Sequence, residues 1–327
     1  MNDETNIIVI DESNYNVNIE ITPNIKIVWF NNDDYKEVCK EKLFPLLESL
    51  ENRQNIEVID VKWTSSFEDL KVITYFPNLK KLIVRGKKLK KFSGIENLIG
   101  LKELSIRTEG SKKRKINGIE NLGISSLSIE AAGQSDLEII SKCTSLKYLR
   151  INGSIDIDFS FFSQLSLLEK MSLVNRRIEE ISNLNCIKNL RTLDIAYCSK
   201  LTRFVENNEN LEVLWIQSCN RLNFDSITQL KNLTRLVMMS QKNISDLDFV
   251  MNMHKLKNMS ISGTNLNSTN LEALKSTKSL KSVWLSANDK IIEDIAKSNR
   301  NLLISNGDIN FKNEKQISDD EYQRLSS

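Results

Sequence analysis

The 327-residue sequence has little of what enzymes use for acid–base or metal chemistry. It contains one histidine, His254, and five cysteines, which form no closely spaced pairs. An odd set of scattered cysteines argues against a disulfide framework or a zinc site. No phosphate-binding glycine loop, nucleophile elbow or paired zinc motif occurs. The sequence therefore predicts a non-enzymatic protein without a cofactor, a metal or catalytic residues.

The sequence also lacks an excess of one sign of charge, and it lacks long apolar runs. The chain has 45 basic and 43 acidic residues, a formal net charge of +2, which implies no overall attraction to polyanions. Acidic residues, Asp3 and Glu4, precede a short apolar run, whereas a secretory signal has basic residues ahead of its apolar run. No apolar run reaches membrane-spanning length. We therefore expect a cytoplasmic protein with no transmembrane segment.

A repeated apolar pattern is the main feature that the sequence does contain. In each copy an apolar residue is followed by two variable residues, an apolar one, a variable one and a further apolar one. Successive copies start 21 to 24 residues apart. The eleven copies begin at Ile56, Leu79, Leu101, Ile124, Leu146, Leu168, Leu190, Leu211, Leu233, Leu256 and Leu280.

This pattern resembles the consensus of the leucine-rich-repeat superfamily, L-x-x-L-x-L-x-x-N/C-x-L. The period near 22 residues and the recurring Asn-Leu pairs before the strands are similar to the internalin-like class of bacteria. Cys198 and Cys219 occupy the Asn/Cys slot as small buried residues, although a redox pair is an alternative. At the same slot of other repeats only Asn288 conforms, and the exceptions are Lys87, Glu109, Ala132, Ser154, Arg176, Gln241 and Thr264.

The resemblance implies an α/β solenoid, with a curved parallel β-sheet on the concave side and short helices or 3-10 turns on the convex side. Residues 1–55 are expected to form an N-terminal cap of strands plus a helix over Asp33–Leu50. Residues 56–305 form the solenoid of about eleven repeats, and residues 306–327 a C-terminal end and flexible tail. Because side chains alternate along a strand, the fourth and sixth positions of each repeat point inward and the third, fifth and seventh point outward.

The outward positions from the fifth repeat onward carry an unusual number of aromatic and aliphatic residues. Stray apolar residues are common on a sheet face, but tryptophans and tyrosines are the side chains that dominate binding energy in protein interfaces. We therefore expect a partner-binding surface made by Tyr148, Val174, Tyr197, Val213, Trp215, Val237, Met239 and Trp284, with Arg150 and Asp194 adding polar contacts.

Lysines and arginines gather in two neighbouring repeats. We expect them to form a basic edge that includes Lys87, Lys88, Lys112, Lys113, Arg114 and Lys115. Without interleaved aromatics this edge is typical of a solvated rim, with an acidic protein partner as the next interpretation and nucleic acid as an unfavoured one.

These observations favour a monomeric scaffold for protein–protein interaction, acting as an adaptor, an inhibitor or an immunity-type neutraliser. The alternative is a structural array whose basic edge anchors it to a polyanion, either nucleic acid or an anionic membrane surface. Binding to a polyanion would weaken steeply with added salt.

Overall fold

The computed structural model of the chain describes residues 7–10, 25–30, 51–61, 70–85, 91–107, 116–242, 244–264, 266–285 and 287–306. The chain divides into two compact units, each described by itself below. The first unit comprises residues 1–175 and 186–189, and the second comprises residues 176–185 and 190–327.

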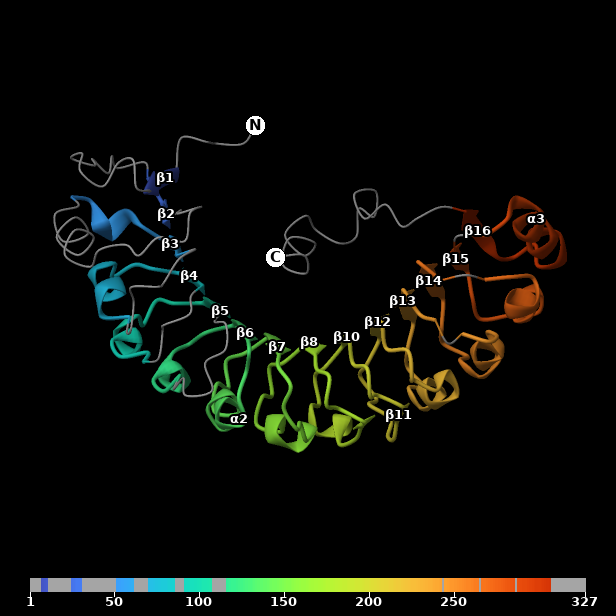
Figure 1. Cartoon of the computed structure of the whole chain (residues 1–327), viewed down its shortest axis with the longest axis horizontal. Coiled ribbons are helices and arrows are strands. Elements are labelled where there is room, and N and C mark those ends of the chain that lie inside the picture. The colour runs from blue at the N-terminus through green and yellow to red at the C-terminus, as the bar shows by residue number, and fades with distance from the viewer. Residues whose placement is uncertain are drawn as a thin grey trace. The chain divides into compact units, whose positions relative to one another are not determined.

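Short parallel strands alternate with short helices along both units (Figure 1). The strands are β1 (Ile7–Ile10), β2 (Ile27–Phe30), β3 (Val58–Val61), β4 (Lys81–Arg85), β5 (Glu103–Arg107), β6 (Ser126–Glu130), β7 (Tyr148–Asn152), β8 (Lys170–Val174), β9 (Glu180–Ile181), β10 (Thr192–Ala196), β11 (Arg203–Phe204), β12 (Val213–Gln217), β13 (Arg235–Met239), β14 (Asn258–Ser262), β15 (Ser282–Leu285) and β16 (Leu303–Asn306). The α-helices are α2 (Gln134–Ile140) and α3 (Asp289–Ser298), and the 3-10 helices are η2 (Arg53–Asn55), η3 (Lys71–Tyr75), η4 (Ile95–Asn97), η5 (Ile119–Asn121), η6 (Phe159–Phe162), η7 (Leu184–Cys186), η8 (Phe224–Gln229), η9 (Asp248–Asn252) and η10 (Thr269–Lys275).

The sheet of each unit follows the order of the chain. In the first unit β1 to β8 pair in parallel, and in the second unit β10, β12, β13, β14, β15 and β16 do the same. The second unit also holds a small parallel pair, β9 with β11. The register keeps equivalent repeat positions side by side, so that Leu82 pairs with Leu104 and Leu214 pairs with Leu236. In each unit the helices lie on the side away from the strands (Figure 1).

The core is built from the inward positions that the repeat predicts. In the first unit Leu104 and Leu149 are at most 2% exposed, and in the second unit Leu193 and Leu236 are completely buried. Apolar residues of the return segments complete the core; for example, the rings of Phe224 and Phe249 stack with centroids 5.6 Å apart. One turn cannot bury its inward row alone, so burial depends on the neighbouring turns.

Every one of the eleven sequence repeats supplies one strand, as expected. The sheet continues beyond them, because β1 and β2 pair in parallel ahead of β3, and β16 follows β15. Among the described return segments most are 3-10 helices, and α2 and α3 are the α-helical ones. The expected helix over Asp33–Leu50 and the tail from residue 307 onward lie outside the described residues.

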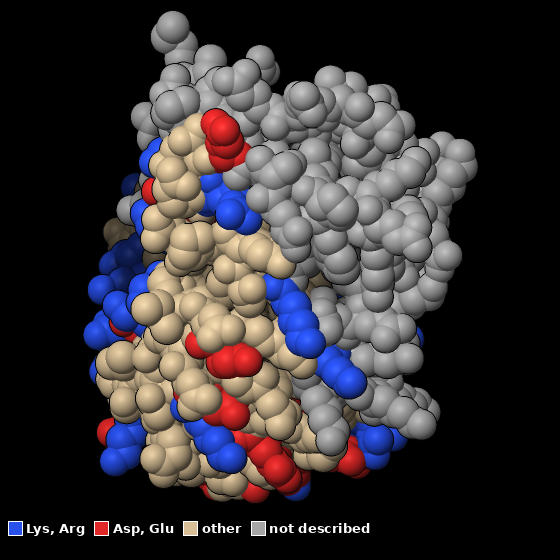
Figure 2. Space-filling view, turned by 90° about the vertical axis from the view of Figure 1, so that its left-hand side faces the viewer, with Lys and Arg blue, Asp and Glu red and all other residues tan. Residues whose placement is uncertain are grey.

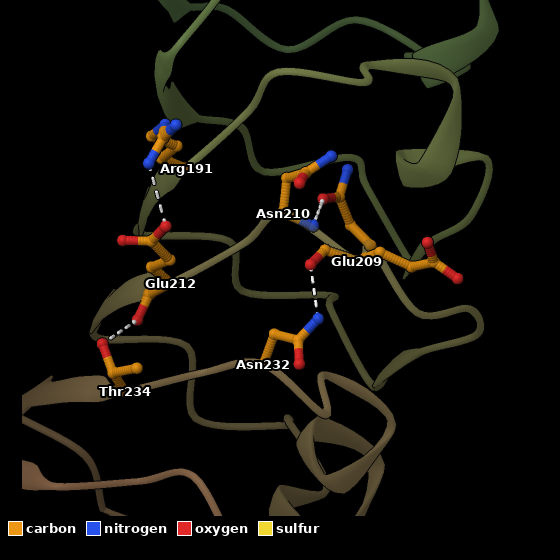
Figure 3. A network of polar contacts seen from close by, with 7 residues as sticks. Arg191, Glu209, Asn210, Glu212, Asn232 and Thr234 are labelled. Carbon is orange, nitrogen blue, oxygen red and sulfur yellow. Dashed lines mark hydrogen bonds and ion pairs between the residues drawn. The ribbon is translucent and has the colours of Figure 1, made fainter.

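Side-chain amides join successive turns through the Asn-Leu pairs that precede the strands. Asn78 donates to the carbonyl oxygen of Gln54 at 2.7 Å and Asn189 donates to that of Ser166 at 2.6 Å, each one turn earlier. Asn232 bonds in the same way to the carbonyl oxygen of Glu209 (Figure 3). In these three pairs the Asn therefore holds two turns together, a role that the repeat pattern alone did not reveal.

An ion pair in the same region also links turns of the second unit. Arg191 Nη1 lies 3.0 Å from Glu212 Oε1, and Thr234 Oγ1 donates to the backbone carbonyl of Glu212 at 3.1 Å (Figure 3). The Arg191 and Glu212 side chains are both exposed, and exposed pairs of this kind contribute little to stability. The backbone ladder and the asparagine amides are therefore the main polar links between these turns.

The consensus Asn slot differs from the expectation in two repeats. Asn288 matches the consensus in sequence but is exposed, and its side chain caps α3 by accepting from the amide of Lys290. In the repeat of β8 the amide comes from Asn175, one residue before the expected Arg176. Asn175 is 1% exposed and donates to the carbonyl of Ile155 at 2.7 Å.

The physical reason for this shift lies in the turn that follows each strand. After β10, β12, β13 and β14 one residue with positive φ precedes the slot, namely Tyr197, Ser218, Ser240 and Gly263. No positive φ occurs in the fully described turn after β8. The slot after β8 is therefore filled by Asn175, which follows the strand directly, one position earlier than in these four repeats.

Candidate functional site

The outward face of the second unit carries two tryptophans in one row across the strands. The strand register aligns the middle outward positions, and this row consists of Asp194, Trp215, Val237, Ser260, Trp284 and Ser305. Trp215 and Trp284 are three strand spacings apart, about 14 Å along the stacking direction. The register thus confirms that both indoles belong to the outward row and not to the leucine core.

The two small residues between the tryptophans are covered. Val237 is 3% exposed and Ser260 is 9% exposed, although both occupy outward positions. Their register neighbours in the row, Trp215 beside Val237 and Trp284 beside Ser260, are larger and partly exposed. Val237 was expected to offer binding surface, and this part of the expectation is wrong because the side chain is buried.

The remaining predicted residues of the second unit flank this row. Val213 and Met239 occupy the first and last outward positions of β12 and β13, and both are partly exposed. Asp194 begins the tryptophan row on β10 and is also partly exposed. Tyr197 was counted with the strand positions, but it lies one residue beyond β10, in the turn, where it is 49% exposed.

The first unit holds the other three predicted residues. Tyr148, Arg150 and Val174 stand at outward positions of β7 and β8 and are partly exposed. The ammonium nitrogen of Lys170 lies 5.8 Å from the centre of the Tyr148 ring, within the range of a cation–π contact. At these positions the face of the first unit combines an aromatic, an aliphatic and charged side chains, whereas Trp215 and Trp284 lie in the second unit.

The basic edge expected from Lys87, Lys88 and residues 112–115 lies outside the described residues. Over the described surface of the first unit, lysines and arginines are interspersed with aspartates and glutamates (Figure 2). Lys81 pairs with Glu103 at 3.2 Å, for example, and Lys80 pairs with Glu57 at 3.0 Å. Paired charges of this kind are typical of a solvated surface.

The buried thiols lie where the repeat predicts. Cys198 and Cys219 are completely buried, and the Cys219 thiol lies 3.8 Å from the carbonyl oxygen of Ile195 in the preceding turn. A hydrogen bond to Cys198 and then burial raise the pKa of the Cys219 thiol. Burial also raises the pKa of the Cys143 thiol, to about 12. Thiols with raised pKa values are poor nucleophiles, which supports their interpretation as core residues.

His254 is exposed in the return segment before β14. Within the described ranges, no group of three or more His, Cys, Asp or Glu residues is placed to hold a metal ion. No helix of the described residues is both long and apolar enough to cross a membrane.

Comparison with known proteins identifies the architecture. The sequence matches no protein-family model and no curated protein. Among solved structures, an internalin from Listeria monocytogenes is similar with a TM-score of 0.50 and 15% identity, over 88% of this chain and 82% of the internalin. A chain of the Toll–Spatzle complex of Drosophila is similar with a TM-score of 0.53 and 13% identity, over 92% of this chain and 47% of that one. Together with the repeat and the stacked parallel strands, these similarities show that the chain has the leucine-rich-repeat fold, of the internalin-like kind.

Proposed function

We propose that this protein is a non-enzymatic scaffold that binds a partner protein on the outward sheet face of its second unit. The observation that carries the proposal is the placement of Trp215 and Trp284 in the middle outward row, outside the leucine core. Tryptophan is the residue most enriched among those that dominate protein interfaces. A role as adaptor, inhibitor or neutraliser is compatible with such a face, since each acts by covering a surface of the partner.

The chemistry of the row fits a protein better than a polyanion. The row contains two indoles and begins with the carboxylate of Asp194, and two partly exposed aliphatic side chains, Val213 and Met239, flank it. A phosphate polymer would be repelled by this carboxylate and would find no cation in the row. We therefore expect a partner with an apolar centre and a polar rim, bound in the cytoplasm by a monomer of this chain.

The proposal is tested by quantitative affinity capture from a lysate of the source organism. The baits are the full chain, its Trp215→Ala variant and a matched control, Ile99→Ala, which truncates an apolar side chain that is 80% exposed in the first unit. We expect one protein to be recovered equally by the full chain and the control and to be depleted strongly by Trp215→Ala. Equal recovery by all three baits would refute the proposed surface.

The rival function is anchoring of a structural array to a polyanion through the lysine-rich segments. Its test uses the double variant Lys112→Ala with Lys113→Ala in the same capture experiment, at two salt concentrations. Loss of capture in this variant and with added salt, combined with normal capture by Trp215→Ala, would favour the polyanion.

A further inference from the structure

Exposed cations line the edge of the second unit where the chain enters the strands β13 to β16. The backbone amide of Lys257 donates to the carbonyl oxygen of Thr234 at 2.8 Å, and that of Lys281 donates to the carbonyl oxygen of Lys257 at 2.7 Å. Residues at the same position of successive turns are therefore side by side, about 4.8 Å apart. The exposed cations of these four turns, called the lysine row below, are Lys231, Lys255, Lys257, Lys278, Lys281 and Arg300.

Among the described residues, no member of the lysine row forms an ion pair with a carboxylate. The four stretches of chain that form this edge contain no aspartate or glutamate. Those stretches are residues 231–234, 254–257, 278–281 and 300–303. Lys255 donates to a neutral group, Oδ1 of Asn232. The carboxylates of Glu272 and Asp294 both pair with Lys275, which lies outside the row, at 3.0 and 2.8 Å. The lysine row therefore keeps its positive charge.

The lysine row is short and ends at acidic residues. The exposed Glu209 occupies the position of Lys231 one turn earlier, and the amide of Thr234 donates to the carbonyl oxygen of Glu212 in that same turn. The four turns from β13 to β16 span three strand spacings, about 14 Å, which an extended polypeptide covers with about four or five residues. A longer polyanion that continued along the stack would be repelled by Glu209 and Glu212.

The lysine row runs beside the tryptophan row. Lys281 directly precedes β15 and lies three residues before Trp284, about 10 Å away along the strand. Protein interfaces have an apolar centre and a polar rim, and complementary charges at the rim speed association and select the partner. A protein that covers the indoles would therefore place its rim on the lysine row.

We propose that the lysine row binds a short carboxylate-rich stretch at the rim of the partner protein, so that the inference rests on the proposed function for the protein that supplies this stretch. The four stretches that form the row contain no phenylalanine, tyrosine or tryptophan on which nucleic-acid bases could stack. Together with the short length of the row, this favours carboxylates of a polypeptide over a nucleic acid.

The test measures binding of a fluorescein-labelled deca-glutamate peptide to the full chain by fluorescence anisotropy at low ionic strength. We expect Lys257→Gln with Lys281→Gln to weaken binding about fivefold, because two exposed charges of the row are lost. The matched control is Lys102→Gln with Lys147→Gln, which removes the same charge from exposed lysines at the same repeat position in the first unit and should leave binding unchanged. Glu209→Gln should tighten binding, because it removes a negative charge at the end of the row, and a misfolded variant cannot give this result.

Two further measurements separate this inference from the proposed function. Trp215→Ala should bind the peptide normally, because the peptide has no apolar side chain. In the capture experiment, the Lys257→Gln, Lys281→Gln protein should recover less of the protein that Trp215→Ala depletes. Full recovery of that protein would overturn the inference and leave the proposed function intact. Normal peptide binding with no protein depleted by Trp215→Ala would refute the proposed function and, with it, the assignment of the carboxylates to that partner.

Two other results would also overturn the inference. The first is equal peptide binding by the two double lysine variants, which would show that the row attracts the peptide only through the net charge of the chain. The second is tighter binding of a single-stranded ten-nucleotide DNA, or of vesicles that contain phosphatidylserine, that is lost in Lys257→Gln with Lys281→Gln. That result would assign the row to phosphates. Thermal unfolding of each variant confirms that it is folded.

Discussion

The side-chain amide of Gln217 donates a hydrogen bond to Oη of Tyr197 at 3.2 Å, while the backbone amide of Tyr197 donates to the carbonyl oxygen of Gln217 at 2.9 Å. These two bonds hold an exposed tyrosine in the left-handed conformation, with φ of 54°. Equivalent turns of the second unit place Ser218, Ser240 or Gly263 there. A bulky aromatic residue at positive φ is strained, and such strain persists in proteins chiefly at functional positions.

We predict that Tyr197→Gly keeps or raises the free energy of unfolding, by up to about 1 kcal/mol, because glycine relieves the strained backbone. The same variant should weaken binding of the partner by roughly tenfold, since the aromatic ring at the edge of the tryptophan row is lost. Urea unfolding and titration of the partner measure the two effects. Tyr197→Ser, the residue of the equivalent turns, is the control for side-chain size. A variant that loses stability and binds normally would show that the tyrosine is structural.

The buried amide of Asn175 gives a prediction about the fold alone. Asn175→Ala removes the donor to the Ile155 carbonyl and leaves that buried acceptor unsatisfied. We expect a loss of about 1 to 3 kcal/mol in the free energy of unfolding, measured by urea denaturation. Asn301 is exposed at the end of the second unit, and Asn301→Ala serves as the control with an expected change within about 0.5 kcal/mol. Similar losses in both variants would contradict a specific role for Asn175.

The sequence was sufficient to predict the strands of the eleven repeats, because each repeat has two apolar residues that are buried only when successive turns stack as parallel strands. It also placed Trp215 and Trp284 correctly, since alternation along a strand decides the face. It could not predict that Val237 is buried, because exposure on the outward face depends on the size of the neighbours across the sheet. The shift from Arg176 to Asn175 was missed for a related reason, because the conformation of the preceding turn sets the slot and is not readable from spacing.

Two arginines of the first unit show a different limit of pattern reasoning. Arg85 and Arg107 are separated by one repeat in the sequence, and only the register shows that they are adjacent at the ends of β4 and β5. Arg150 was predicted to add a polar contact to the aromatic surface, whereas the register places it in the first unit between Ser128 and Ser172. The feature of the sequence that indicates their proximity is the equal position of Arg85 and Arg107 in consecutive repeats.

The thiol of Cys143 predicts a dependence of stability on pH. Its pKa is raised from 9.0 to about 12 by burial, so between these values the folded protein keeps a proton that the unfolded chain loses. The contribution of this thiol is therefore fully present below pH 9 and declines as the pH rises, by about 1 kcal/mol per pH unit. Urea unfolding at pH 8 and pH 10 should show a smaller decline for Cys143→Ala than for the unmodified chain. Equal declines would show that the thiol titrates normally in the folded protein.

Chemical modification tests the inertness of the buried thiols separately. At neutral pH we expect iodoacetamide to leave Cys143, Cys198 and Cys219 unmodified in the folded protein, since their thiolate fraction is small and they are buried. The partly exposed Cys186 is the internal control and should react. Mass spectrometry of the alkylated peptides gives the result. Rapid labelling of Cys198 or Cys219 would support the alternative interpretation of these two cysteines as a redox pair.

The last prediction concerns how Trp215 and Trp284 divide the binding energy. Each truncation to alanine should cost about 2 kcal/mol or more in partner affinity, roughly a thirtyfold loss, while the free energy of unfolding changes by at most about 1 kcal/mol because neither indole belongs to the leucine core. Since about 14 Å and two covered residues separate the indoles, their effects should add to within about 0.5 kcal/mol in the double variant. Calorimetric titration of the partner into the four proteins of this cycle measures the coupling directly. A coupling above about 1 kcal/mol would mean that the partner or the face rearranges around both indoles together, and a loss confined to one of them would move the centre of the interface to that residue.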